Sequence, residues 1–254
     1  TRSAARSATI CCWIWKRKSS APPMSRKSTE FAGHGFELHP SGGLFWLAES
    51  LLIVGDLHLE KASSYHASGQ FLPPYDTGQT LARLAAVLAE TGASRLLFLG
   101  DVFHDGRAWS RMSDADKALL SDLLAPVESI WVEGNHDQSF VPPGHSAVTE
   151  IEIGGIVLRH IMDEADGRPE ISAHYHPAAV IHHRGSRVRR PCFVRAADRL
   201  IIPAFGVLTG GLDCRDDALA ALRGRDTQLF LLGKDDVFVP PAGLAADKRR
   251  SRRR

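Results

Sequence analysis

The sequence predicts an α/β fold in which two β-sheets pack face to face and are flanked by helices. Between residues 51 and 132, short apolar runs alternate with amphipathic helical segments, which is typical of strands in a parallel sheet. From residue 151 onward, short strand candidates separated by Gly and Pro follow one another with little helix, which favours a mainly antiparallel second sheet. The 254 residues, 44% of them hydrophobic, can bury one substantial core, so we expect one globular domain.

The first half opens with a hairpin and continues with strands separated by helices. The hairpin is expected from residues 35–39 and 44–48, which flank a turn-forming run at 40–43. The apolar runs 51–55, 95–99 and 129–132 are expected to be buried strands. A helix over 76–90 is expected because its apolar residues share one face and Gly92 follows as a stop signal, and Ser113 begins a capping box that opens a helix over 114–124.

The second half is predicted as a series of short strands with one helix at 216–223. Because Gly and Pro separate the apolar runs, each run is short enough to be a strand of a second sheet packed on the first. The strand candidates are 151–153, 156–160, 171–176, 191–194, 200–202, 229–232 and 237–239.

Basic residues are concentrated at the two ends of the chain. Residues 1–27 hold seven Lys and Arg and residues 248–254 hold six, and neither segment has an acidic residue. The remaining 18 basic residues face all 29 acidic residues, so the body from 28 to 247 has a formal charge of −11. An acidic body repels a polyanion unless bound metal or a local basic stretch compensates. We expect the ends to be solvated tails, with a nucleic-acid or partner contact as the alternative.

We therefore expect a disordered or cloning-derived basic lead-in at 1–27, one folded domain at 28–240 and a basic tail at 241–254. The apolar run 8–15 is too short to span a membrane and enters a basic run without a cleavage pattern, so neither a membrane segment nor a signal peptide is expected. The four cysteines show no Cys-x-x-Cys spacing, so neither a disulfide framework nor a thiolate zinc site is indicated. A cytoplasmic location fits these features best.

The three strands of the first half each end in or near a glycine followed by side chains that can bind a metal or transfer a proton. Asp56 and His58 follow the first strand, Asp101 follows the second, and the run Asn135-His136-Asp137 follows the third. Ligands in open α/β sheets collect beyond the carboxyl ends of the strands, so these side chains are expected to form a site. For Asp56 and His58 taken alone, a capping Asp and a partly buried His in a short loop are an equally good explanation.

The full series of such side chains resembles the motifs of the calcineurin-like metallophosphoesterases. In order, it comprises Asp56-x-His58, Gly100-Asp101, Gly134-Asn135-His136-Asp137, His160 and His174-x-His176. The segments 55–61, 172–177, 190–193, 203–206 and 209–212 are in addition similar to one bacterial branch, the ligase-associated DNA damage response endonucleases. The resemblance implies a four-layer α/β/β/α metallophosphoesterase fold and, for the branch, a DNA endonuclease of DNA repair with a DNA ligase and a helicase as possible partners.

The resemblance also implies two divalent metal ions. By position in the family's motifs, one ion would be bound by Asp56, His58 and His176, the other by Asn135, His160 and His174, and Asp101 would bridge them. Independently, carboxylate, imidazole and amide ligands without a thiolate suit Mn²⁺, which we expect first, or Fe or Zn. Two ions about 3.5 to 4 Å apart can hold both oxygens of an in-line displacement at phosphorus, with a metal-bridging hydroxide as nucleophile.

Two further residues receive chemical roles from the resemblance. His136 would face the scissile phosphate, as proton donor to the leaving oxygen or as a stabiliser of developing charge. Asp137 is then a candidate for the partner that fixes the His136 tautomer, with a plain loop carboxylate as the alternative. Ile161 follows His160 and Ala173 precedes His174 where the family usually has glycine, so we expect less open loop backbones there.

Candidate substrate contacts lie close to these motifs. His104 follows Asp101 by three positions and could reach the substrate. The run 182–190 is the only dense basic patch inside the acidic body. This run is either a solvated hairpin tip or a clamp on a phosphate backbone, formed by Arg184, Arg187, Arg189 and Arg190.

These features lead us to expect a metal-dependent phosphodiesterase that acts on DNA. The first alternative is a phosphoesterase for small nucleotide diesters, phosphomonoesters or pyrophosphates, because the metal site would be shared and the acidic body weakens the case for DNA. The second alternative is a non-catalytic scaffold, although a scaffold has no physical need for His136 beside two metal positions.

Overall fold

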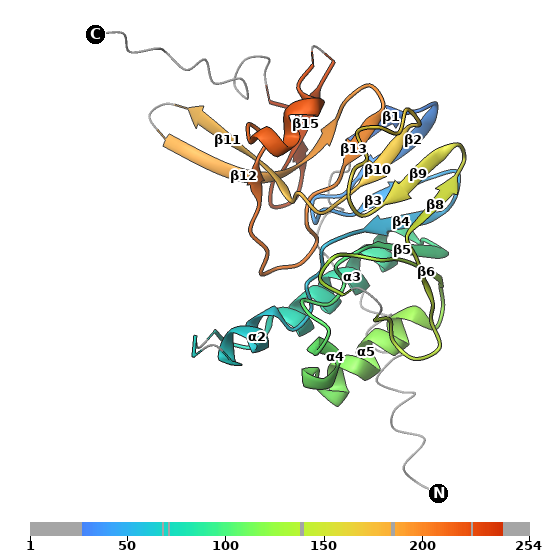
Figure 1. Ribbon diagram of the computed structural model, residues 1–254, viewed down its shortest axis with the longest axis vertical. Coiled ribbons are helices and arrows are strands. Elements are labelled where there is room, and N and C mark those ends of the chain that lie inside the picture. The colour runs from blue at the N-terminus through green and yellow to red at the C-terminus, as the bar shows by residue number, and fades with distance from the viewer. Residues whose placement is uncertain are drawn as a thin grey trace, which may run out of the picture.

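The computed structural model describes residues 27–240 apart from 68, 71, 138, 139, 184, 185 and 225. The predicted lead-in and tail therefore lie outside the described residues, except that Lys27 begins the first strand. Two sheets pack on each other, and the longer helices lie against the outer side of the first one (Figure 1). Among the described residues, no helix combines the length and apolar composition that crossing a membrane requires.

The first sheet has seven strands in the order of the sequence. They are β1 (Lys27–Phe31), β2 (His34–Leu38), β3 (Leu44–Trp46), β4 (Leu51–Val54), β5 (Arg95–Leu99), β6 (Glu128–Val132) and β7 (Ala147–Val148). The pairs from β1 to β4 are antiparallel, and those from β4 to β7 are parallel. The parallel half confirms the prediction and brings the carboxyl ends of β4, β5 and β6 to one edge of the sheet.

The second sheet has nine strands and is mixed. They are β8 (Glu150–Ile153), β9 (Ile156–Arg159), β10 (Glu170–Ser172), β11 (Pro177–His183), β12 (Ser186–Arg195), β13 (Arg199–Ile201), β14 (Leu212–Asp213), β15 (Gln228–Leu232) and β16 (Val237–Phe238). Most pairs between the described strands are antiparallel, as expected, but β10 is parallel to both β9 and β13. The ends of β9 and β10 therefore point to the same edge.

Three apolar clusters define the layers. One lies between the sheets and includes Trp46 and Phe193, which are fully buried. A second lies between the first sheet and two helices, α3 (Asp76–Thr91) and α5 (Asp114–Leu124). The third covers the outer side of the second sheet beneath the 3-10 helix η1 (Asp217–Leu222), which stands where a helix over 216–223 was predicted. The layers follow the predicted α/β/β/α order, with a thin fourth layer.

The helix ends follow the signals in the sequence. Gly92 ends α3 in the left-handed conformation at φ +64°, and its N–H donates to the Leu88 carbonyl. Ser113 begins α5, and its hydroxyl oxygen accepts the N–H of Asp116.

Several elements differ from the prediction. Six were not expected, namely the strands β1, β7, β11 and β14 and the short helices α2 (Lys61–Ala67) and α4 (Ala108–Arg111). Most of them are short, and they lack a clear apolar period. The strand expected at 171–176 ends at Ser172, since the backbone turns left-handed at His174 and His176. The strand expected at 191–194 is the end of the ten-residue β12.

Candidate metal centre

The predicted ligands meet where the edges of the two sheets come together. Asp56, Asp101 and Asn135 follow β4, β5 and β6, while His160 follows β9 and the pair His174 and His176 follows β10. Backbone hydrogen bonds join these segments: the His58 N–H donates to the Asp101 carbonyl at 3.0 Å, and the Ala173 N–H donates to the His160 carbonyl at 3.0 Å. The Asp56 carboxylate accepts the His174 N–H at 3.0 Å and so links the two sheets.

One cluster of side chains, the Asp56 group, consists of Asp56, His58 and His176. Their ligand atoms all lie within 4.8 Å of one another. His176 Nε2 is 3.1 Å from Asp56 Oδ1 and 3.4 Å from His58 Nε2. Asp56 and His58 are buried, and His176 is partly exposed. These are the three residues predicted for one ion.

A second cluster, the Asp101 group, consists of Asp101, His160 and His174, again within 4.8 Å. His160 Nε2 is 3.3 Å from Asp101 Oδ2 and 3.1 Å from the side-chain oxygen of Asn135. His160 Nδ1 donates to the Leu99 carbonyl at 2.8 Å, which directs Nε2 at the carboxylate. Asp101 Oδ2 also lies 3.8 Å from His58 Nε2, so this carboxylate stands between the two groups.

The backbone of this centre is strained. Asp56, His58, Asp101, His174 and His176 have φ values between +44° and +64°, in the left-handed region that L-residues avoid. Each such residue costs roughly 1–3 kcal/mol and persists only where the surrounding structure enforces it. Five of the seven predicted ligands therefore occupy a conformation that clusters at functional sites.

Glycine makes the close approach of these segments possible. A Cβ atom on Gly134 would lie 2.1 Å from the backbone nitrogen of Asp101, and one on Gly100 would lie 2.3 Å from Nδ1 of His160. Ala173 stands where the family usually has glycine, and Gly55 leaves room for its methyl group. A Cβ atom added to Gly55 would lie 2.7 Å from that methyl group. His174 still adopts φ +64°, so Ala173 does not prevent the turn.

Burial and charge set the protonation of the centre. Burial lowers the pKa of His58 to about 2, with Asp101 opposing this effect and His176 adding to it, and burial also lowers the pKa of His174. Burial disfavours the ionised Asp101 carboxylate, but its interactions with His160 outweigh burial and lower its pKa. Neutral His58 and His174 beside an ionised Asp101 are the protonation states that bind a divalent cation.

The donor set fits such a cation. Asp56 Oδ1 is buried and accepts no hydrogen bond among the described residues, although His176 Nε2 lies near it. A buried carboxylate oxygen without a donor is costly unless a cation completes its surroundings. The imidazole, carboxylate and amide ligands could hold Mn, Fe or Zn ions, one in each group.

His136 stands at the mouth of the centre with 42% of its side chain exposed. The backbone N–H of His136 donates to Asp101 Oδ1 at 2.8 Å, and the ring Nε2 of His136 lies 4.0 Å from Asp101 Oδ2. Its Nδ1 donates to the carbonyl of His104 at 3.0 Å. The His104 carbonyl therefore fixes the tautomer of His136, with Nε2 facing the centre.

Asp137 has a different task from the one expected. Its buried carboxylate accepts the N–H groups of Val102 at 2.7 Å, Phe103 at 3.1 Å and Gly134 at 3.2 Å. Burial raises its pKa, although these hydrogen bonds act in the opposite direction. The prediction that Asp137 fixes the His136 tautomer is wrong, because its acceptor atoms hold the 134–137 loop against the segment after β5.

His104 and Lys61 extend the centre on one side. The ring of His104 stacks on that of His136 with centroids 5.4 Å apart, and its Nδ1 lies 3.4 Å from His58 Nδ1. His58, His104 and His136 form a third group with ligand atoms within 4.8 Å. Burial lowers the pKa of His104, and the positive charge of Lys61 lowers it further. No role was predicted for Lys61 from the sequence.

The predicted arginines lie on the hairpin of β11 and β12, which projects from the second sheet (Figure 1). Arg187, Arg189 and Arg190 are exposed on β12, and Arg184 lies outside the described residues. Arg189 donates to the Gly211 carbonyl. Leu212, the next residue, donates its N–H to the His176 carbonyl at 3.0 Å, so Arg189 is tied to the rim of the Asp56 group.

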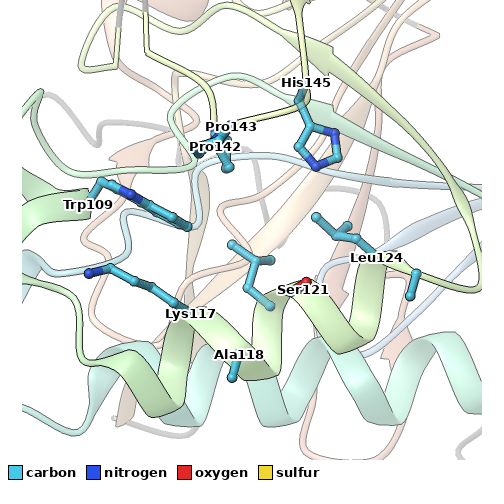
Figure 2. Close-up of a pocket in the computed structure, with 10 residues that line it drawn as sticks. Trp109, Lys117, Ala118, Ser121, Leu124, Pro142, Pro143 and His145 are labelled. Carbon is cyan, nitrogen blue, oxygen red and sulfur yellow. The ribbon is translucent and has the colours of Figure 1, made fainter.

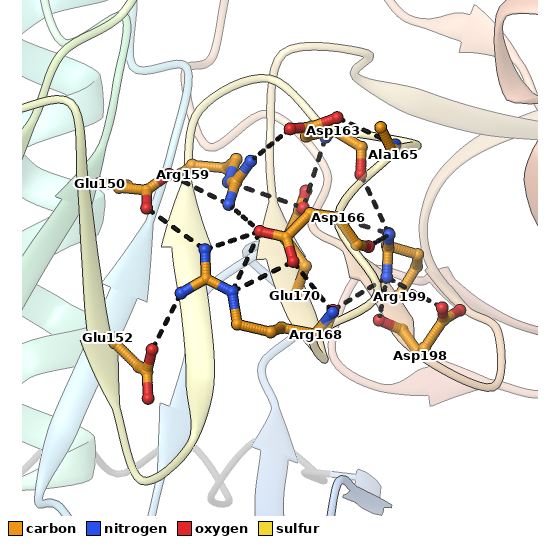
Figure 3. A network of polar contacts seen from close by, with 10 residues as sticks. All are labelled: Glu150, Glu152, Arg159, Asp163, Ala165, Asp166, Arg168, Glu170, Asp198 and Arg199. Carbon is orange, nitrogen blue, oxygen red and sulfur yellow. Dashed lines mark hydrogen bonds and ion pairs between the residues drawn. The ribbon is translucent and has the colours of Figure 1, made fainter.

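An ion-pair network behind the Asp101 group was not predicted. Figure 3 shows Arg159 and Arg199 around the fully buried Glu170, with Asp163 and Asp166 on the outer side. Arg159 contacts Glu150 at 3.0 Å, Asp163 at 3.1 Å and Glu170 at 3.6 Å. The network closes the 160–170 loop between His160 and β10. Sequence spacing gave no signal for it, because its partners lie on β8, β9, the 163–168 loop, β10 and the segment 198–199.

A groove beside the centre has different chemistry. It lies between α5 and the 142–145 loop, has a volume of about 510 Å³ and is lined mainly by apolar residues, with Trp109, Lys117 and His145 at its edges (Figure 2). None of the predicted ligands lines it. We therefore assign the candidate site to the converging histidines and carboxylates.

Comparison with known proteins identifies the family. The model of the calcineurin-like phosphoesterases matches residues 50–194, which is more than half of the chain. The comparison with curated proteins gives no match.

Several solved structures are similar to this chain, and a nuclease and a phosphoesterase are two of them. The crystal structure of Pseudomonas putida nuclease MPE has 29% sequence identity and a TM-score of 0.67, and the match covers 85% of this chain and 100% of that one. YfcE, a phosphoesterase from E. coli, has 17% identity and a TM-score of 0.36, with 73% of this chain and 88% of that one covered. On the family match, the chain belongs to the calcineurin-like phosphoesterases and is a hydrolase of phosphate esters.

Proposed function

We propose that this protein is a phosphodiesterase with two divalent metal ions that cleaves DNA. The observation that carries the proposal is the convergence of two ligand groups on Asp101, whose Oδ2 lies 3.3 Å from His160 Nε2 and 3.8 Å from His58 Nε2. Such an arrangement suits two ions that share one carboxylate. The similarity to a nuclease over that chain's whole length supports a nucleic acid as the substrate class.

The ligand roles follow the two groups. Asp56, His58 and His176 would hold one ion, His160, His174 and Asn135 the other, and Asp101 would bridge them. When bound, the ions would activate a water molecule as nucleophile and neutralise charge on the phosphate. Mn²⁺ is our first choice, since carboxylate and imidazole ligands without a thiolate suit it.

His136 supplies the proton chemistry. Its Nδ1–H is held by the His104 carbonyl at 3.0 Å, so the proton that can be transferred sits on Nε2, which faces the centre. Asp101 Oδ2, 4.0 Å away, stabilises the charged imidazolium. The imidazolium would donate its Nε2 proton to the leaving oxygen or stabilise charge on the phosphate. His104, stacked on His136, would contact the substrate.

The face of β12 that carries Arg187 and Arg189 would contact a polymeric substrate. Arg187 and Arg189 point to the same face of the strand, and Arg189 is anchored at Gly211 next to the segment of His176. Arg187 and Arg189 would bind phosphates that flank the scissile one, and Arg184 and Arg190 would add positive charge nearby. The local positive charge offsets the repulsion between the acidic body and DNA.

The cellular setting is part of the proposal. A DNA endonuclease with these properties would act in DNA repair, with a DNA ligase and a helicase as partners, in the cytoplasm. Co-purification of a ligase or helicase with the tagged protein would test the partners.

The first experiment tests the metal chemistry. We expect the purified protein with Mn²⁺ to hydrolyse bis-p-nitrophenyl phosphate, and Asp101→Ala to lower kcat/KM by about a thousand-fold or more, because the substitution removes the shared ligand of both ions. Lys234→Ala, an exposed change in a distant turn, serves as the control. Unchanged turnover in the Asp101 variant would contradict the two-ion arrangement.

The second experiment tests the substrate class. A variant with Arg187, Arg189 and Arg190 changed to Ala should bind single-stranded DNA more weakly and reduce the slope of log affinity against log salt by about 2, since each phosphate contact on a single strand contributes roughly 0.7. Hydrolysis of the small diester should stay unchanged. If DNA binding and nicking are also unchanged, the arginine clamp is wrong and a small diester becomes the preferred substrate.

A further inference from the structure

Two cysteines that are 22 positions apart in the sequence meet beneath η1 on the outer side of the second sheet. Cys192 Sγ, on β12, lies 3.3 Å from Cys214 Sγ, in the turn after β14. Both belong to the apolar cluster that includes Leu219 and Leu222. Cys192 is fully buried, whereas Cys214 is partly exposed. Cys214 is therefore the residue of the pair that lies partly open to solvent.

The surroundings also give the two thiols different acidities. The contact with Cys192 lowers the pKa of Cys214, while the same contact together with burial raises the pKa of Cys192. The thiolate is the reactive form of cysteine towards oxidants, and exposure is the second requirement. Cys214 meets both conditions, and Cys192 is placed to react with it afterwards.

We infer that Cys192 and Cys214 form a redox modification site, which closes to a disulfide when a hydroperoxide oxidises Cys214. The Cys214 sulfur attacks the peroxide, so that the O–O bond breaks, an S–O bond forms and water or an alcohol leaves. The Cys192 sulfur then attacks the Cys214 sulfur, the S–O bond breaks, and the hydroxyl group leaves as water with the Cys192 proton. The peroxide gains two electrons and the two thiols lose two.

Closure of this bond would act on the metal centre. The sulfur atoms are 3.3 Å apart and must come to about 2.05 Å in a disulfide, so the Cys214 side chain and the turn that carries it are drawn towards β12. The Cys214 N–H donates to the Ala178 carbonyl at 3.0 Å, and the Leu212 N–H donates to the His176 carbonyl at 3.0 Å. A shift of this turn is therefore passed directly to His176 of the Asp56 group. The effect on turnover rests on the proposed function, whereas formation of the bond does not.

The test uses the full chain with Cys11 and Cys12 changed to Ser, so that only the two described thiols remain. The reduced protein is treated with hydrogen peroxide, its remaining thiols are alkylated, and peptides are mapped by mass spectrometry. We expect a peptide that links Cys192 to Cys214 and lacks two hydrogen atoms. In Cys192→Ser we expect a sulfenic acid at Cys214 that dimedone traps, and in Cys214→Ser an unmodified Cys192. A link that forms only in urea, or equal modification of the two thiols, would overturn the proposal.

Two measurements test the connection to His176. Oxidation should speed amide exchange at Leu212 and Cys214 several-fold, and it should lower hydrolysis of bis-p-nitrophenyl phosphate several-fold, with recovery in dithiothreitol. A linked protein with unchanged amide exchange at both positions would overturn the coupling. If the reduced protein hydrolyses no phosphodiester at all, the proposed function fails, while the peptide map and the exchange rates still decide on the thiol pair.

Discussion

The Asp101 group and the Asp56 group contain the same kinds of ligand but are supported in different ways. Behind the Asp101 group, Arg159 and Arg199 surround Glu170, and all three residues are at most 9% exposed. The Asp56 group is bordered by the 203–214 segment, which is joined to it through backbone hydrogen bonds from Phe205 to Gly55 and from Gly206 to Asp56. The Asp101 group is therefore supported by buried ion pairs, and the Asp56 group is supported by a loop.

This difference indicates how each group responds to change. A buried ion pair that loses one partner leaves an uncompensated charge, so the network tolerates little alteration. A surface segment held by backbone hydrogen bonds can shift without exposing a charge. We therefore expect the Asp101 group to be the rigid half of the centre and the Asp56 group to be the adjustable half.

The sharpest comparison substitutes one histidine in each group. His160→Ala and His176→Ala should both lower kcat/KM with Mn²⁺ by at least about 100-fold, the upper end of the loss caused by removing an indirect metal partner. His160→Ala should also lower the free energy of unfolding by about 1–3 kcal/mol, because the buried Leu99 carbonyl loses its donor. His176 is partly exposed and should have a smaller effect on denaturant unfolding. Equal destabilisation would contradict the comparison.

The next largest effect is expected within the network. Glu170→Ala should lower the free energy of unfolding by about 1–3 kcal/mol, because Arg159 and Arg199 lose their buried carboxylate partner and keep only the outer ones, such as Asp163 and Asp198. Chemical denaturation would measure the loss. Glu170→Gln preserves the shape, and Asp122→Asn is an exposed control on α5. A loss for Glu170→Ala no greater than for Asp122→Asn would show that the network does not support this group.

The smallest effect is expected at the outer edge of the network and depends on pH. The hydrogen bond from Arg168 lowers the pKa of Asp166 below its ordinary value of 3.8. A carboxylate with a lowered folded pKa stabilises the protein above its ordinary pKa, and this contribution is lost as the pH falls towards the folded value. Thermal unfolding of the native protein and of Asp166→Asn should therefore differ at pH 6, and the difference should shrink steadily as the pH falls below about 4. A constant difference would argue against this ion pair.

The sequence predicts the centre better than it predicts the support of the centre. Asp56, Asp101 and the 135–137 run could be placed because each follows an apolar strand, and parallel strands bring their ends to one edge. The Glu170 network and the Cys192–Cys214 contact could not be predicted, since their partners are brought together only by the topology of the second sheet. Asp137 was assigned a wrong role because a motif fixes the type of a residue and not the direction of its side chain.

The elements show the same division. Long segments with a clear period, such as α3 and α5, have the predicted ends within one or two residues. The short elements α2 and α4 were missed, yet they hold Lys61 and the segment after His104 beside the centre. The apolar period of a sequence predicts a helix of several turns, whereas tertiary contacts decide whether a helix of one or two turns forms.

Gly134 places a limit on any redesign of this centre. The side chains around it could be exchanged to alter metal preference or proton transfer, but position 134 has no room for a methyl group, which would meet the backbone nitrogen and the carboxylate oxygen of Asp101 at 2.1 Å. A residue without a side chain thus sets the spacing between the ends of β5 and β6. A library that varies all positions of the 133–137 loop would lose most of its active members at this one.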